Sequence, residues 1–130
     1  MVGLMAAGVV AYRMLSKPAG PAPPEVARDA LLAQGRVIYL ARCVACHGLD
    51  GRGDGPLAGN LVGPPVGDLS DQEWKHGDRP EQVLAVIGQG VPNSRMDGWS
   101  RVLDPPELNA VAAYVYYLAK RPVPEELRKE

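Results

Sequence analysis

The chain places both of its cysteines in one short stretch, CVACHG at residues 43–48, and a histidine follows the second cysteine directly. Two thiols separated by two residues can add across the two vinyl groups of a haem, and the next residue can then present its imidazole to the iron. Covalent attachment explains the spacing of Cys43 and Cys46, and axial ligation explains the adjacent His47. The motif therefore predicts one covalently bound haem c, with His47 as a ligand of its iron.

Other interpretations of this motif account for less of the sequence. A thioredoxin-type dithiol needs a βαβ setting, which the sequence does not provide. A structural zinc site needs four ligands, whereas Cys43, Cys46 and His47 supply three. The only other histidine is His76. A disulfide across two intervening residues would close almost no loop, and a chance match in an ordinary helix is the alternative without chemistry.

A closed electron carrier needs a second protein ligand for the haem iron, and methionine is the ligand that raises the potential. Three of the four methionines lie within residues 1–15, so Met96 is the only one in the globular part of the chain. Met96 is therefore the predicted sixth ligand, although a lone loop methionine is more often a filler of core gaps. His76 and Lys75 are its rivals, and a solvated surface histidine is the simpler interpretation of His76 in its polar turn.

The elements that must position these side chains begin with a helix that contains the cysteine motif. Apolar residues recur at spacings of three and four over residues 25–47, which predicts a single helix with one apolar face. The members of this predicted face are Val26, Ala30, Ala33, Val37, Leu40 and Ala41. The following segment, residues 47–69, is dense in glycine and proline and is predicted to be loop.

Three further helices are predicted downstream. A serine and a glutamate in capping-box spacing indicate a short helix over residues 70–74. A helix over 80–90 starts with proline at a first-turn position and ends at Gly88 or Gly90. The last helix, over 105–119, opens with Pro-Pro-Glu. The pattern is all-α, with three to four helices and no convincing strand, and such long loops in a small domain indicate an enclosed ligand.

Composition is typical of a small domain that needs a ligand to fill its centre. The chain has 130 residues, 15 glycines, 13 prolines and no phenylalanine, so it can bury only a modest core of its own. Its net charge of −1 gives no electrostatic footprint for nucleic acid. The predicted segments are a membrane anchor or uncleaved signal-like segment at 1–15, a Pro-rich linker at 16–24, the globular domain at 25–119 and a polar tail at 120–130.

Taken together, residues 33–119 resemble a class I, mono-haem c-type cytochrome. CVACHG followed by DGRGDGP matches the haem loop of that family, and residues 68–99 resemble the second half of haem domains in the cytochrome c subunits of cbb3-type oxidases. The family methionine is usually followed by proline, which Asp97 replaces here. The resemblance implies a small cytochrome c fold wrapped around one covalent haem. It also implies a contact between Gly35 in the first helix and Tyr114 in the last.

Further pocket residues follow from the resemblance. In the family a proline carbonyl accepts a hydrogen bond from the other ring nitrogen of the proximal histidine, and this bond orients the ring. Pro64 and Pro65 are the candidates for that proline in this chain. Trp74 and Trp99 could line the haem pocket or donate an indole N–H to a haem propionate, with plain packing as an equal alternative.

Ligation by both His47 and Met96 would leave no iron position open, so the predicted function is one-electron transfer without enzymatic chemistry. The expected partners are redox proteins or the subunits of a membrane respiratory or photosynthetic complex, with no nucleic acid and no small-molecule substrate. The alternative is a haem enzyme or sensor with a labile sixth ligand. Haem attachment in bacteria, as the resemblance implies, occurs outside the cytoplasmic membrane. The domain is therefore expected on the periplasmic side, anchored by residues 1–15.

Overall fold

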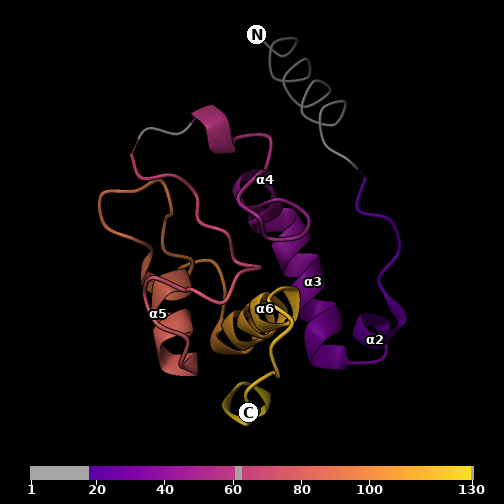
Figure 1. The fold of residues 1–130 in the computed structure, drawn as a ribbon. Coiled ribbons are helices and arrows are strands. Elements are labelled where there is room, and N and C mark those ends of the chain that lie inside the picture. The colour runs from indigo at the N-terminus through magenta and orange to yellow at the C-terminus, as the bar shows by residue number, and fades with distance from the viewer. Residues whose placement is uncertain (1–17, 61–62, 130) are drawn as a thin grey trace, which may run out of the picture.

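A computed structural model describes residues 18–60 and 63–129, and over these residues the fold is all-α (Figure 1). One isolated antiparallel bridge, between Gly90 and Asp97, is the only strand-like pairing in that range. The predicted membrane anchor at residues 1–15 lies outside the described residues. Within them, every helix falls short of the length and apolar character that crossing a membrane requires.

The two longest helices, α3 (Ala30–Arg42) and α6 (Pro105–Leu118), pack against each other and supply most of the core. Gly35 permits their close approach, because a Cβ added there would lie only 2.0 Å from the carbonyl oxygen of Ala110. The same Cβ would lie 3.0 Å from the Cβ of Tyr114. The predicted contact between Gly35 and the last helix is confirmed.

The predicted single helix over residues 25–47 is wrong. The chain divides there into α2 (Pro24–Ala27), α3 and α4 (Val44–His47). Asp29 starts α3, because its carboxylate accepts hydrogen bonds from two N–H groups of the first turn. Cys43 ends α3 and separates it from α4.

The predicted apolar face of that helix is wrong in most of its members, although Val26 is fully buried and Leu40 packs against the core. The buried residues of α3 are Leu32, Gly35, Ile38 and Tyr39. Val37, which belongs to the predicted face, is 68% exposed. Because the chain restarts at its own cap, the register that begins at α2 does not continue into α3.

Helix α5 (Pro80–Gln89) packs on α6, so that α3 and α5 lie on either side of it (Figure 1). It ends at Gly90, one of the two predicted stops. The long loop after α4 contains the short η1 (Ala58–Asn60). This loop approaches the loop after α5, since a Cβ on Gly63 would lie 3.2 Å from the carbonyl oxygen of Asn93.

The short helix predicted over residues 70–74 does not form. Asp68 accepts a hydrogen bond from the N–H of Ser70, and Asp71 accepts one from the N–H of Glu73. Each aspartate thus satisfies a backbone donor two residues further on, and this stabilises turns in place of a helix.

The C-terminal segment returns to the domain after α6. The short η2 (Glu125–Arg128) buries Leu127, which is 2% exposed. Arg128 forms a salt bridge with Asp29, with 2.8 Å between Nη2 and Oδ2. The sequence predicts only a polar tail at 120–130, because one leucine among charged residues gives no periodic signal. The domain boundaries themselves stay predictions.

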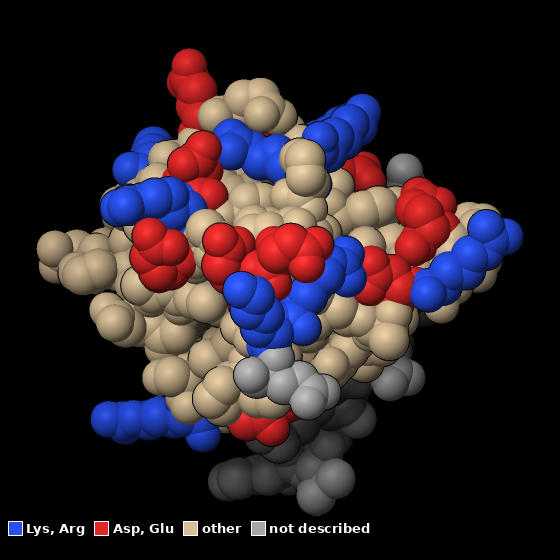
Figure 2. Space-filling model, turned by 90° about the horizontal axis from the view of Figure 1, so that it is seen from below, with Lys and Arg blue, Asp and Glu red and all other residues tan. Residues whose placement is uncertain are grey.

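The charged side chains are mixed on the surface that Figure 2 shows. Acidic and basic groups lie next to one another there over a largely uncharged ground, and neither sign forms a continuous patch. This distribution agrees with the net charge of −1. That face offers no basic stripe of the kind that nucleic-acid binding uses.

Candidate functional site

The cysteine motif and the loop methionine border one cavity. Cys43, Cys46 and His47 line it from the end of α3 and from α4, and Met96 lines it from the loop after α5. Its volume is about 350 Å³. The aliphatic lining includes Leu69, Val83, Ile87, Val91, Val111 and Val115. The structure therefore brings together the four residues that the sequence assigns to the haem and its iron.

The glycine-rich loop clasps the cysteine motif. The N–H of His47 donates to the carbonyl oxygen of Cys43 at 2.9 Å, and the carbonyl oxygen of His47 accepts from the N–H of Gly53, also at 2.9 Å. Gly55 has no room for a side chain, because a Cβ there would lie 2.3 Å from the carbonyl oxygen of Ala45. The glycines that follow the motif thus let the loop backbone pack directly on α4 and fix the histidine.

Tyr39 ties the same loop to α3. It is fully buried and borders the cavity, and its hydroxyl donates to the carbonyl oxygen of Gly48 at 2.6 Å. Burial raises the pKa of Tyr39 far above its ordinary value, so the hydroxyl keeps its proton. Gly48 adopts a φ of +81°, which turns the chain out of α4.

Burial sets the protonation of the motif. Burial, reinforced by the nearby Cys46, raises the pKa of Cys43 to about 12, so this thiol is protonated at neutral pH. Burial lowers the pKa of His47, so its ring is neutral and keeps a lone pair for a metal. The Nδ1 atom of His47 is buried without a hydrogen-bond partner among the described residues.

Met96 is held by backbone contacts in a narrow turn. The N–H of Val91 donates to the carbonyl oxygen of Met96 at 3.1 Å, and the N–H of Met96 donates to Oγ of Ser94 at 3.1 Å. The bridge between Gly90 and Asp97 closes the base of this turn. The turn therefore fixes the backbone that carries the thioether.

The two rivals of Met96 border the same cavity. His76 and Lys75 both lie along it, and both are exposed. Met96 is half-buried and packs against the core. A half-buried side chain loses less freedom on binding a metal than an exposed one, which favours Met96. The choice of the sixth ligand stays a prediction.

The two tryptophans also border the cavity, but the contacts of Trp74 are already defined. Its indole N–H donates to the carbonyl oxygen of Leu69 at 3.0 Å. Its ring packs edge-on against Tyr116, with centroids 5.1 Å apart. An indole has one donor, so Trp74 has none left for a propionate in this arrangement. Trp99 is the better candidate for that contact.

Pro64 and Pro65 border the cavity as well. Neither carbonyl accepts a hydrogen bond from His47, since Nδ1 of this residue has no partner in the part of the chain that the structure describes. The orphaned nitrogen shows that the ring still needs an acceptor. The assignment of a proline carbonyl to that role stays a prediction.

Sequence reasoning missed two arginines that pack on the tryptophans of the cavity wall. The guanidinium carbon of Arg42 lies 5.8 Å from the ring centroid of Trp99. That of Arg121 lies 4.3 Å from the ring centroid of Trp74. Arg42 directly precedes the cysteine motif, so its place at the cavity wall could have been predicted from the sequence. Arg121 is far from its tryptophan in sequence, so no local pattern indicates this pairing.

The described residues fit a covalently bound haem. Two thiols, a neutral imidazole and a thioether border one cavity whose surface is largely apolar. The buried Nδ1 of His47 can donate to an added acceptor and so leave the other ring nitrogen for the iron. In residues 18–60 and 63–129, no group of three or more His, Cys, Asp and Glu side chains is arranged to hold a metal ion.

Comparisons with known sequences point to one family. A family model described as cytochrome c oxidase, cbb3-type, subunit III matches residues 30–115. The chain is 35% identical over 86 residues to the Cbb3-type cytochrome c oxidase subunit FixP of Bradyrhizobium diazoefficiens, which covers 66% of this chain and 27% of that protein. It is 36% identical over 93 residues to the Cbb3-type cytochrome c oxidase subunit CcoP of Cereibacter sphaeroides, and the match covers 68% of this chain and 28% of that protein. The chain thus spans little more than a quarter of these relatives.

Two solved structures are similar in fold. The Kuenenia stuttgartiensis reducing HAO-like protein complex Kustc0457/Kustc0458 matches with a TM-score of 0.66 at 27% identity, covering 79% of this chain and 49% of that chain. The KustC0563 c-type cytochrome matches with a TM-score of 0.50 at 27% identity, covering 66% of this chain and 94% of that chain. The comparisons confirm the all-α, c-type cytochrome fold and the predicted cofactor, a covalently bound haem c with iron.

Proposed function

Because this chain belongs to the family of cbb3-type cytochrome c oxidase subunit III, we propose that it carries single electrons on its haem c. The observation that carries the proposal is the one cavity that Cys43, Cys46, His47 and Met96 all border. Cys43 and Cys46 would hold the haem covalently, and His47 and Met96 would ligate its iron. Bound there, the haem supplies a one-electron iron couple.

The chain's own residues give the site the properties of a carrier. The aliphatic part of the lining would shield a bound haem from water, and this would disfavour the more highly charged oxidised state. The backbone clasp on α4 holds His47, and the narrow turn after α5 holds Met96. With His47 and Met96 as iron ligands, the domain would make and break no substrate bonds. No observation favours the alternative of a haem enzyme or sensor with a labile sixth ligand.

The proposal extends to partners and location. The relatives from Bradyrhizobium diazoefficiens and Cereibacter sphaeroides are named as subunits of cbb3-type cytochrome c oxidases. By that similarity, the partners of this chain are redox proteins or subunits of a membrane respiratory complex. The haem domain then faces the periplasm, and the apolar residues 1–15 hold it at the membrane.

One experiment separates the carrier from its alternatives. The exported protein should keep haem stain after denaturation and exceed the mass of the bare chain by one haem. Its oxidised form should show the weak red charge-transfer band of methionine ligation, and its reduced form should not bind carbon monoxide readily. A mass equal to the bare chain would refute attachment. Rapid carbon monoxide binding would support the enzyme or sensor alternative instead.

A further inference from the structure

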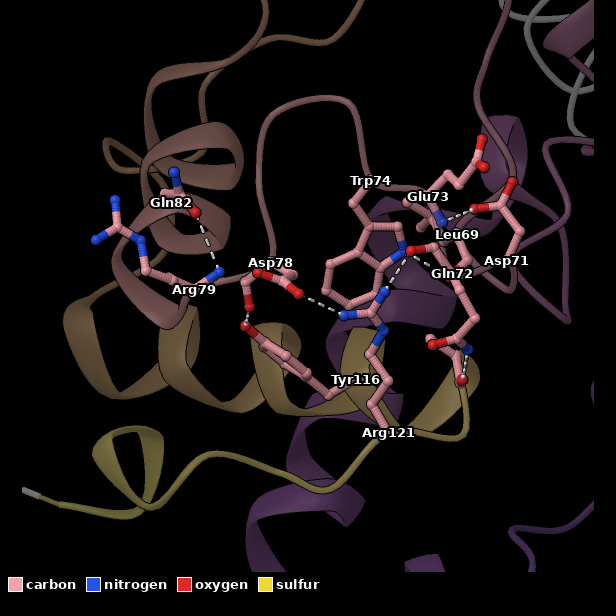
Figure 3. Close-up of polar contacts among 11 residues, drawn as sticks. Leu69, Asp71, Gln72, Glu73, Trp74, Asp78, Arg79, Gln82, Tyr116 and Arg121 are labelled. Atoms are coloured by element: carbon pink, nitrogen blue, oxygen red, sulfur yellow. Dashed lines mark hydrogen bonds and ion pairs between the residues drawn. The ribbon is translucent and has the colours of Figure 1, made fainter.

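The wall of the cavity that contains Trp74 is tied to the end of α6 by one arginine (Figure 3). Nη1 of Arg121 lies 3.0 Å from Oδ2 of Asp78, and Nη2 donates to the carbonyl oxygen of Gln72 at 2.7 Å. One guanidinium therefore holds both ends of residues 72–78.

Two further hydrogen bonds join the same segment to α6 and its end (Figure 3). The side-chain amide of Gln72 donates to the carbonyl oxygen of Ala119 at 3.1 Å. The hydroxyl of Tyr116 donates to the carbonyl oxygen of Asp78. The segment is thus fastened at two points besides Arg121, so replacement of the arginine should loosen the Trp74 wall without releasing the whole segment.

The guanidinium of Arg121 also packs on the ring of Trp74. Its central carbon lies 4.3 Å from the ring centroid, well within the range of a cation–π contact. Trp74 borders the cavity, whereas Arg121 is not among the residues that line it. The positive charge therefore contacts the wall without entering the cavity.

The charges of Arg121 and Asp78 are unequally screened. The side chain of Arg121 is 16% exposed and that of Asp78 is 63% exposed. Nε of Arg121 is buried and has no partner among the described residues. Water screens an exposed carboxylate better than a buried guanidinium, so the contribution of this pair to the field at Trp74 is positive.

We propose that Arg121 is a positioning residue of the electron-transfer site, which holds Trp74 in the cavity wall and raises the reduction potential. This inference rests on the proposed function. The oxidised iron carries one more positive charge than the reduced iron. A positive charge behind the wall therefore disfavours oxidation.

The test compares two variants of the haem-bearing protein. Arg121→Met removes the charge and keeps an unbranched side chain, while Arg121→Lys keeps the charge and loses the planar stacking group. In Arg121→Met, we expect the affinity for the electron to fall about three- to tenfold. A tenfold change equals about 59 mV for a one-electron couple. In both variants, hydrogen exchange of the Trp74 indole N–H should be faster than in wild type, as measured by NMR of the reduced protein. The reduction potential of Arg121→Lys, however, should stay close to that of wild type.

Arg128→Met is the matched control. Arg128 lies in the same C-terminal segment and forms a salt bridge with Asp29, yet it does not border the cavity or contact Trp74. Its loss should leave the potential and the Trp74 exchange rate unchanged. A wild-type potential in Arg121→Met would overturn the inference and leave the proposed function intact. Absence of a reversible haem couple in the unsubstituted protein would overturn both.

A third variant covers the case in which Arg121→Met does not fold. Asp78→Asn keeps the guanidinium and removes its exposed, largely screened counter-charge, so the potential should stay at the wild-type value or rise slightly. A lowered potential in Asp78→Asn would contradict a field set by Arg121.

Discussion

The cysteine motif and the loop of Trp74 border the same cavity, but the chain holds them by different means. Around His47, hydrogen bonds from the loop that directly follows it in the sequence hold the single turn of α4. Met96 is likewise held by contacts within its own turn, to Val91 and Ser94. Trp74, by contrast, lies in a loop that a distant part of the chain, Arg121, anchors. Local contacts thus build the two ligand-bearing regions, and tertiary contacts build the Trp74 wall.

Substitutions in the different parts of the cavity wall should therefore have different effects on the haem. The largest effect should come from the attachment side: Cys43→Ala combined with Cys46→Ala should remove all covalent haem, because no other cysteine can form a thioether. Haem stain of denatured protein measures this directly. The matched control is Ser94→Ala on the methionine side, which should keep full stain. Covalent haem in the double variant would refute attachment through the motif.

On the methionine side, Met96→Ala should keep the haem and change its properties. The red charge-transfer band should vanish, carbon monoxide should bind readily, and the potential should fall by on the order of 0.1–0.3 V, since axial ligands tune haem potentials over about 0.8 V. Visible spectra and a redox titration measure these changes. His76→Ala and Lys75→Ala are the controls and should match wild type. If one of them loses the band instead, that residue is the ligand.

The same division explains how much the sequence reveals. The cofactor, the all-α fold and the packing of Gly35 follow from short motifs and from the resemblance they carry. The continuous helix over 25–47 was a wrong prediction, because periodicity cannot detect that Asp29 caps a new helix. The helix over 70–74 was wrong because aspartates two residues before each donor compete with the capping box.

The contacts that the sequence does not predict are those between residues far apart along the chain. Arg121 and Leu127 fall in a segment that looks like a polar tail, yet one packs on Trp74 and the other is buried. No local spacing encodes the contact of Arg121 with Trp74, because α5 and α6 lie between these two residues in the chain.

A third prediction concerns the helix pair that supports both sides. Gly35→Val should destabilise the domain by about 1–3 kcal/mol or more, because a Cβ has no room against the backbone of Ala110. Chemical denaturation measures the free energy of unfolding. Ala41→Val is the matched control, since Ala41 lies on an exposed part of the same helix and its replacement should cost only about 0.5 kcal/mol. Equal stabilities of the two variants would contradict the close helix contact.

The smallest effect should come from the start of α3, far from the cavity. Asp29 caps this helix and pairs with Arg128, and the hydrogen bond from Arg128 is the main cause that lowers the pKa of Asp29. Asp29→Asn keeps a capping oxygen but loses the charge, so it should cost about 0.2–1 kcal/mol at pH 7. Because folding lowers this pKa, the stabilisation is present above the unfolded value of about 3.9 and is lost as pH falls through the folded value.

The stability gap between wild type and Asp29→Asn should therefore be constant from pH 7 to about pH 5 and should shrink below about pH 4. Denaturation curves across this pH range measure the gap. Asp104→Asn at the start of α6 is the control for a cap without an arginine, because the contacts of Asp104 are with Glu107 of its own helix. The haem spectrum should not change in either variant, since neither aspartate borders the cavity. A gap at Asp29 that persists undiminished in acid would show that it does not arise from the charge of Asp29 or from its salt bridge with Arg128.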